Sequence, residues 1–203
     1  MENLYLIVGL GNPGSQYQRT RHNVGFIVTE LLAERWKASW SMEKRFNARL
    51  ARAEYEGRRV LLIEPQTFMN ASGEAVQAVV AFYNTIEPAR VLVVVDDADL
   101  PLGNLRMRPG GSPGGHHGLE SIEKHLGTRE YPRLRVGIGR QPGAREITGH
   151  VLGRFSSTEG KLADKVLALA ANQAETWVVA GIQKAMNQFN GAVEDAPDEG
   201  KDK

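Results

Sequence analysis

The 203-residue chain contains no cysteine. This excludes a disulfide framework, a thiol nucleophile and a thiolate metal site, and it agrees with a reducing compartment. No apolar run approaches the roughly 20 residues that span a bilayer. The N-terminus also lacks the basic and apolar segments of a secretory signal. We therefore expect a cytoplasmic protein with no membrane partner.

Several signatures of catalytic, nucleotide and metal sites are missing as well. The chain has no G-x-S-x-G elbow for a serine nucleophile and no G-x-x-x-x-G-K-[ST] loop. Asp97-Ala98-Asp99 begins like a calcium loop, but Leu102 stands where the sharp turn requires glycine. No H-E-x-x-H or comparable spacing occurs, although the adjacent His116 and His117 leave a metal site as a lesser alternative. We expect a site without metal or cofactor.

A glycine motif near the N-terminus could indicate a dinucleotide site. The apolar run of residues 4–8 ends in glycines that match G-x-G-x-x-G, namely Gly9, Gly11 and Gly14. In a dinucleotide-binding unit a helix starts within the motif and an acid follows about 20 residues later. Here Pro13 interrupts that helix, and the acid would fall inside the next helix, near Glu34. A nucleotide-dependent oxidoreductase is therefore the weaker hypothesis.

The hydrophobic pattern alternates between short strands and helices. It predicts strands at residues 4–8, 91–95, 105–108 and 134–138, and a hairpin over 46–64. It predicts helices over 24–37 and 67–83, after residue 118 to 125, and from 156 to about 189. The last opens with a capping box of Ser156 and Glu159. These elements indicate a three-layer α/β sandwich with a central mixed, largely parallel sheet flanked by helices.

Charge is distributed unevenly along the chain, although its net value is only +1. Residues 104–145 contain eight basic and three acidic side chains, a net charge of +5. Such a segment suggests a polyanionic partner, whereas a solvated charged face is the simpler interpretation. Residues 191–203 carry a net charge of −3. We expect one domain over residues 1–190 and a disordered acidic tail over 191–203.

Four loops concentrate the residues that could perform chemistry: 9–25, 65–73, 96–103 and 110–118. Loops that leave the same edge of a sheet converge on one cleft. His22 is the best candidate base, because a neutral imidazole can take a proton from water. Asp96, at the end of a predicted strand, is the best acid to orient it. The amides of Asn12 and Asn70 could hold a carbonyl group or the water.

Together these segments resemble bacterial peptidyl-tRNA hydrolase. The matching stretches are Val8–Gly14 with Tyr17, Thr20–Gly25, Pro65–Asn70 with Ser72-Gly73, Asp96–Pro101 with Gly103, Gly114–His116 with Gly118-Leu119, and Arg133–Gly139. That family hydrolyses the ester between a peptide and the 3′ end of tRNA, on peptidyl-tRNAs that leave the ribosome prematurely. The resemblance implies a mixed-sheet α/β sandwich that acts as a monomer, without a metal.

The resemblance also implies roles for individual residues. His22 is the catalytic base and Asp96 its partner. Further side chains position the substrate and water or line the cleft, namely Asn12, Asn70, Tyr17 and Met69. Basic side chains bind the phosphate of the tRNA 5′ end, namely Arg108 and Arg135, with Arg106 assisting. This set agrees with the positive charge of residues 104–145.

One residue departs from the family pattern. The usual motif is Gly-Gly-His-Asn-Gly, but His117 replaces the asparagine here. That asparagine helps to hold the substrate or water, and an imidazole offers its donor and acceptor with a different geometry. If His117 keeps the substrate-binding role, it adds a second ionisation to the pH profile. A non-catalytic RNA-binding protein on the same fold is the main alternative, although mere binding does not need the pair of His22 and Asp96.

Overall fold

The computed structural model describes residues 4–140 and 147–193 of the chain. Within these ranges eight strands form one sheet in the order β2-β3-β4-β1-β5-β7-β6-β8. The strands are β1 (Leu4–Gly9), β2 (Trp40–Glu43), β3 (Ala48–Tyr55), β4 (Arg58–Pro65), β5 (Val91–Asp97), β6 (Asn104–Arg108), β7 (Arg133–Gly137) and β8 (Gly191–Ala192). The central strands β4, β1, β5 and β7 run parallel, and the outer pairings are antiparallel. The predicted mixed, largely parallel sheet is confirmed.

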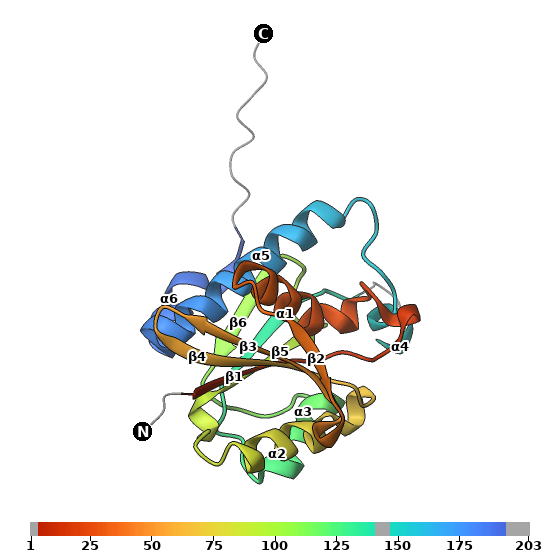
Figure 1. The fold of residues 1–203 in the computed structure, drawn as a ribbon. Helices are drawn as coiled ribbons and strands as arrows, with labels where there is room; N and C mark the ends of the chain where they lie inside the picture. The colour runs from red at the N-terminus through yellow and green to blue at the C-terminus, as the bar shows by residue number, and fades with distance from the viewer. Residues whose placement is uncertain (1–3, 141–146, 194–203) are drawn as a thin grey trace.

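Helices cover both faces of this sheet (Figure 1). Helices α1 (Val24–Arg35), α5 (Gly160–Ala180) and α6 (Ile182–Phe189) lie on one face, and α2 (Ser72–Phe82) and α3 (His117–Leu126) lie on the other. Because β1 and β5 are covered on both sides, the side chains of β1 and of residues 91–95 in β5 are apolar in both directions. The parallel strands end at the edge where α4 (Ile147–Val151) lies beside the loop after β1.

Two glycines allow α1 to pack unusually close to β1. A Cβ atom on Gly9 would lie 2.4 Å from the carbonyl oxygen of Gly25, and one on Gly25 would lie 2.4 Å from that of Val94. Any larger residue at these positions would push the helix away from the sheet. The glycines near the first strand therefore serve helix packing and bring the start of α1 to the end of β5.

Helix boundaries differ from the expected ones where local signals compete. The helix expected from residue 67 begins at Ser72, after a short 3-10 turn over Met69–Ala71. Ser156 and Glu159 form the reciprocal bonds of a capping box, but α5 begins only at Gly160, so these bonds close the turn before the helix. The expected single helix is broken at Gly181, whose φ of +82° does not continue a helix.

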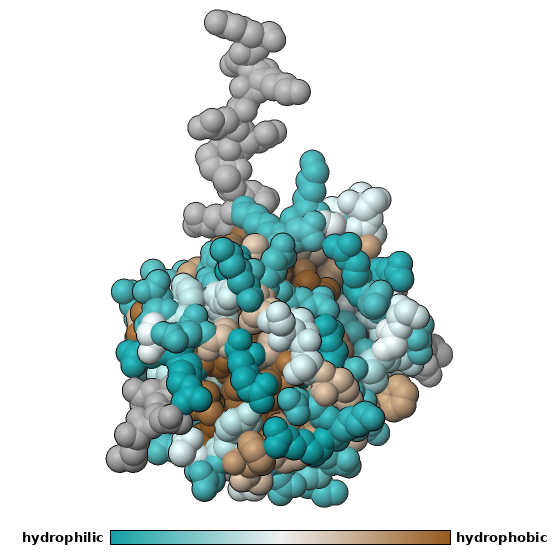
Figure 2. Space-filling view, viewed as in Figure 1, coloured by the Kyte–Doolittle hydropathy of each residue, from teal (hydrophilic) through white to brown (hydrophobic). Residues whose placement is uncertain are grey.

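The C-terminal boundary also differs from the expectation. Gly191 and Ala192 form β8, which pairs with β6, so the folded part continues beyond residue 190. The rest of the predicted tail, residues 194–203, lies outside the described residues. Hydrophilic side chains cover most of the face seen in Figure 2, with hydrophobic surface between them. None of the described helices combines the length and apolarity needed to cross a bilayer.

Candidate active site

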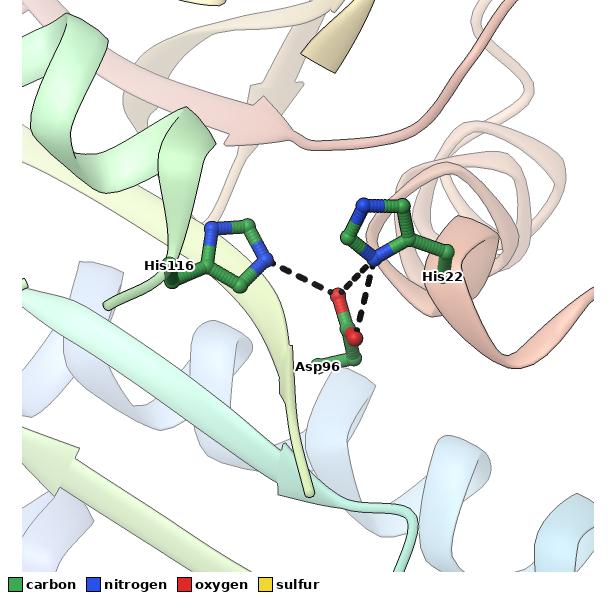
Figure 3. Close-up of side chains that lie close together, drawn as sticks. All are labelled: His22, Asp96 and His116. Carbon is green, nitrogen blue, oxygen red and sulfur yellow. Dashed lines mark hydrogen bonds and ion pairs between the residues drawn. The ribbon is translucent and has the colours of Figure 1, made fainter. Parts of the chain in front are cut away.

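Three side chains from distant parts of the chain meet at the carboxyl end of the central strands (Figure 3). Asp96 lies in β5, His22 in a 3-10 turn over Arg21–Asn23, and His116 is the N-cap residue of α3. Nδ1 of His22 lies 2.9 Å from Oδ1 and 3.0 Å from Oδ2 of Asp96. Nε2 of His116 lies 3.0 Å from the same Oδ1. One buried carboxylate therefore bridges two imidazoles.

The hydrogen bonds assign the protons of both rings. Nδ1 of His116 accepts from the backbone N–H groups of Gly118 and Leu119, at 3.2 and 3.4 Å, so its proton is on Nε2 and is donated to Asp96. His22 donates Nδ1–H to the same carboxylate. Its Nε2 points away from Asp96 in Figure 3 and keeps a free lone pair. That atom can act as a base.

The two imidazoles keep Asp96 ionised despite its burial. The side chain is 3% exposed, and burial alone would raise its pKa. The electrostatic attraction of the imidazole N–H groups and their hydrogen bonds, first those of His116 and then those of His22, outweigh burial and hold the pKa of Asp96 well below its usual range. The site therefore contains a permanent negative charge beside the candidate base.

The same three residues are close enough to suggest a metal site, since their ligand atoms lie within 4.8 Å of one another. The bonding of His116 opposes this. A metal on Nε2 requires the ring proton on Nδ1, but two backbone N–H groups already point at Nδ1. The ring would have to leave its position at the start of α3. The cluster fits an acid–base pair better than a divalent metal.

A cavity of about 440 Å³ opens beside this cluster. Its lining includes Asn12, His22, Asp96 and His116 together with Asp97, Ala98, Asp99, Gly114, Gly115, His117, Arg135 and Arg140. Thr148, Val151 and Leu152, from α4 and the residue that follows it, complete the lining, and we call these three residues the α4 wall. The lining is thus mainly polar around the cluster and partly apolar at the α4 wall.

Asn12 is fixed so that its amide can donate into this cavity. Its backbone N–H donates to Oδ1 of Asn23 at 3.0 Å, and Nδ2 of Asn23 donates to its carbonyl oxygen at 3.0 Å. Its own Oδ1 accepts from the backbone N–H of Met69 at 2.8 Å. Because the oxygen is occupied, Nδ2 is the group left to meet a substrate carbonyl.

Of the other predicted substrate-binding residues, only His117 belongs to the described lining of this cavity. The Met69 side chain is buried in the core under Gly118, so it touches the site through its backbone. Asn70 is exposed in the 3-10 turn before α2, and Tyr17 is half-buried in a 3-10 turn over Ser15–Tyr17. His117 lines the cavity, is 76% exposed, and lies 3.0 Å from the Glu120 carboxylate.

The predicted phosphate-binding arginines share one face of the outer sheet. Arg106 lies directly opposite Arg135 in the antiparallel pair of β6 and β7, and Arg108 lies opposite Arg133. Arg106 and Arg108 are exposed. Arg135 is largely covered, and it donates to the Asp97 carboxylate at 3.3 Å and to the Ser112 carbonyl at 3.0 Å. Arg106 and Arg108 are therefore more accessible to an anion than Arg135 is.

Sequence reasoning missed His116 and the α4 wall. His116 appeared in the Gly-Gly-His motif, and its place just before a predicted helix start was the signal for a capping role. Nothing in residues 147–152 indicated a cavity wall, because a five-residue helix has little periodicity.

Comparisons with known proteins agree on one family. A family model described as peptidyl-tRNA hydrolase matches residues 6–197. A peptidyl-tRNA hydrolase from Synechococcus sp. (strain JA-3-3Ab) is 49% identical over 195 residues, covering 96% of this chain and 86% of that protein. One from Chloroflexus aggregans is 47% identical over 188 residues, covering 92% and 99%. The crystal structure of the Acinetobacter baumannii peptidyl-tRNA hydrolase is 40% identical, with a TM-score of 0.87 and coverage of 95% and 97%.

Proposed function

The chain belongs to the peptidyl-tRNA hydrolase family and is a hydrolase that acts on peptidyl-tRNA, and we propose that His22, held by Asp96, is the base of its reaction. The observation that carries this proposal is the pair of short contacts from His22 Nδ1 to the Asp96 carboxylate. They leave Nε2 as an acceptor beside the cavity, where a general base has to lie.

The reaction starts with a water molecule that donates a hydrogen bond to Nε2 of His22. As the water oxygen adds to the ester carbonyl carbon, its proton passes to Nε2, and the ionised Asp96 stabilises the imidazolium. The carbonyl oxygen becomes an oxyanion that can accept from Nδ2 of Asn12. The intermediate then expels the ribose oxygen of the tRNA, which takes the proton from Nε2 and leaves a free peptide acid.

His116 supports this chemistry without reaching the water. Its Nε2–H bond to Oδ1 gives Asp96 a second donor, and its Nδ1 anchors the ring to the start of α3. The carboxylate is therefore fixed from two sides. A protein that merely bound RNA would have no use for a buried carboxylate held in this way, which favours the enzyme over the RNA-binding alternative.

Beside the cavity the protein has a basic surface suited to the tRNA body. Arg106 and Arg108 project from β6 on the same face as Arg135, which lines the cavity. Planar guanidinium groups suit phosphate because each offers two parallel donors. We propose that these arginines bind a backbone or terminal phosphate while the ester lies at His22. The protein is proposed to act as a monomer in the cytoplasm.

The test is release of free tRNA from an N-blocked aminoacyl-tRNA, measured without added metal other than the magnesium that folds the tRNA. The wild-type protein should release tRNA, and His22→Ala should lose turnover while it retains salt-dependent tRNA binding. Turnover by folded His22→Ala at the wild-type rate would contradict the proposed role of His22. Absence of turnover in the wild type, with tRNA bound, would favour the RNA-binding alternative.

A further inference from the structure

We propose that Arg21 is a positioning residue for this reaction, which holds the α4 wall of the cavity against the loop that carries His22. This inference rests on the proposed function, because it takes the cavity at His22 as the reaction centre. Arg21 immediately precedes His22 in the chain, yet it is not part of the described cavity wall. It is 8% exposed, and its side chain points toward a different part of the chain.

The Arg21 guanidinium contacts the segment of residues 150–159. Nη1 donates to the carbonyl oxygen of Arg154 at 2.8 Å and, more weakly, to that of His150 at 3.4 Å. Nη2 donates to Oε2 of Glu159 at 2.8 Å. The guanidinium carbon also lies 5.2 Å from the centre of the Phe155 ring. One buried cation thus contacts several residues of the segment that connects α4 to α5.

The backbone of the same loop is attached to this segment too. The N–H group of Arg21 donates to the Gly153 carbonyl at 2.9 Å, and Thr20 forms an isolated antiparallel bridge with Arg154. A Cβ atom on Gly153 would lie 3.1 Å from Nη1 of Arg21, so glycine leaves room for the guanidinium. Backbone and side chain together join the catalytic loop to the residues behind the wall.

The wall needs such an attachment because α4 is too short to be stable by itself. It has five residues, whereas isolated helices below about 12 residues are marginal in water. It is also linked to the rest of the molecule by a contact of 3.3 Å from Nε2 of His150 to the Ile138 carbonyl and by the packing of Val151 against the core. The hydrogen bonds of Arg21 add to this packing, and we infer that they set the position of Val151 and Leu152 at the cavity.

Glu159 extends the attachment to the start of α5. Its Oε2 accepts from Nη2 of Arg21 and from the N–H group of Ser156, both at 2.8 Å. Partial burial alone would raise the pKa of Glu159, but the Ser156 bonds and Arg21 together lower it. The carboxylate is therefore charged at neutral pH, and the ion pair with Arg21 persists under assay conditions.

An arginine with a purely structural role would make the same contacts. The test therefore needs a measurement that does not change when only the stability of the protein changes. Arg21→Met keeps an unbranched apolar stem and removes the guanidinium group with every donor. Ser156→Ala is the matched control, because it removes the bond from Glu159 N–H to Ser156 Oγ but leaves the pair of Arg21 and Glu159 intact. Both variants are assayed on N-blocked aminoacyl-tRNA, well below their unfolding midpoints.

We expect Arg21→Met to raise KM about tenfold, which corresponds to about 1.4 kcal/mol of binding free energy, because loss of the three guanidinium hydrogen bonds loosens the α4 wall. Because the pair of His22 and Asp96 is untouched, kcat should change much less and the pH profile should keep its shape. Amide hydrogen exchange over residues 148–154 should become faster in Arg21→Met and stay unchanged in Ser156→Ala. Arg21→Lys, which keeps the charge but not the fork, should give an intermediate KM and replaces Arg21→Met if that variant does not fold.

Three results would overturn the proposal. They are a KM for the Arg21 variant equal to that of the wild type, an equal rise in KM for Ser156→Ala, or a loss confined to kcat with an altered pH profile. Failure of the proposed function is distinguishable, because it would appear as an inactive wild type. In that case hydrogen exchange over 148–154 still reports whether Arg21 holds the wall.

Discussion

Replacement of Asp96 by asparagine changes the charge and the donors of this side chain but hardly its shape. The native carboxylate accepts from His22 at 2.9 Å and from His116 at 3.0 Å. Nδ1 of His22 lies near both carboxylate oxygens, so the NH₂ group of an asparagine faces His22 whichever oxygen it replaces. His116 cannot give up its Nε2 proton, because the N–H groups of Gly118 and Leu119 point at its Nδ1. The amide oxygen is therefore drawn to the Oδ1 position.

The NH₂ group then takes the place of Oδ2, which lies 3.0 Å from Nδ1 of His22. His22 relieves the clash of donors by moving its proton to Nε2, which removes the base. The variant also loses the charge that faces the imidazolium, an interaction of about 4 kcal/mol for charges 4 Å apart at an effective dielectric constant of about 20. At about 1.4 kcal/mol per factor of ten, we expect kcat/KM to fall about 1000-fold.

The assay compares kcat/KM for tRNA release by Asp96→Asn and by the matched variant Asp97→Asn. Asp97 also lines the cavity, but its carboxylate accepts hydrogen bonds from Arg135 and from the backbone of Asp99 rather than from the two imidazoles. Its replacement should therefore cost far less activity. Nitrogen NMR of the imidazoles should place the His22 proton on Nε2 in Asp96→Asn. A loss below about tenfold in this variant, or an equal loss in Asp97→Asn, would refute the reasoning.

Three further changes probe other parts of the molecule. Burial raises the pKa of Glu64 from 4.5 to about 7 despite its bond to Arg49, so its folded form holds a proton that the unfolded chain has lost. The stability from this group is complete below about pH 4.5 and disappears as the pH rises to about 7, a change of up to about 3 kcal/mol. In denaturant unfolding, the free energy of unfolding of Glu64→Gln should therefore rise relative to that of the wild type between pH 5 and pH 8. A difference between the two proteins that does not change with pH would exclude the effect. Arg108→Ala should weaken tRNA binding and reduce the slope of log affinity against log salt by about 1, with little change in kcat, and an unchanged slope would remove Arg108 from the phosphate contacts. His117→Asn should keep both the activity and the shape of the pH profile, because the side chain is 76% exposed and faces Glu120; loss of an ionisation in this variant would show that His117 acts on the substrate.

The parallel core of the fold could be predicted from the sequence because its signals are local. The apolar runs that become β1 and β5 read as buried strands, and the turn at Glu56-Gly57 fixed the hairpin of β3 and β4. The edge strands β2 and β8 were missed. β2 has a polar, exposed pattern, and β8 is two residues that exist through their pairing with β6. Edge pairing of this kind depends on the neighbouring strand more than on the sequence itself.

Like the fold, the candidate site could be predicted from the sequence only in part. The polar loops after strands singled out His22, Asp96 and Asn12, and the structure brings these three to one cavity. Met69 was expected to line the cleft, but packing beneath Gly118 buries its side chain. His116 stands within the Gly-Gly-His motif, yet its contact with Asp96 follows from the way α3 packs on the sheet.

The sequence alone determined the family, the order of the central elements and the identity of the candidate base and its acid, because each is written in short contiguous motifs. Only the tertiary structure decided which histidine completes the cluster, which nitrogen is free, and which helix lines the cavity. These depend on contacts between residues 20, 74 and 138 positions apart in the chain. Packing of whole elements sets such contacts, and no local pattern of residues carries that information.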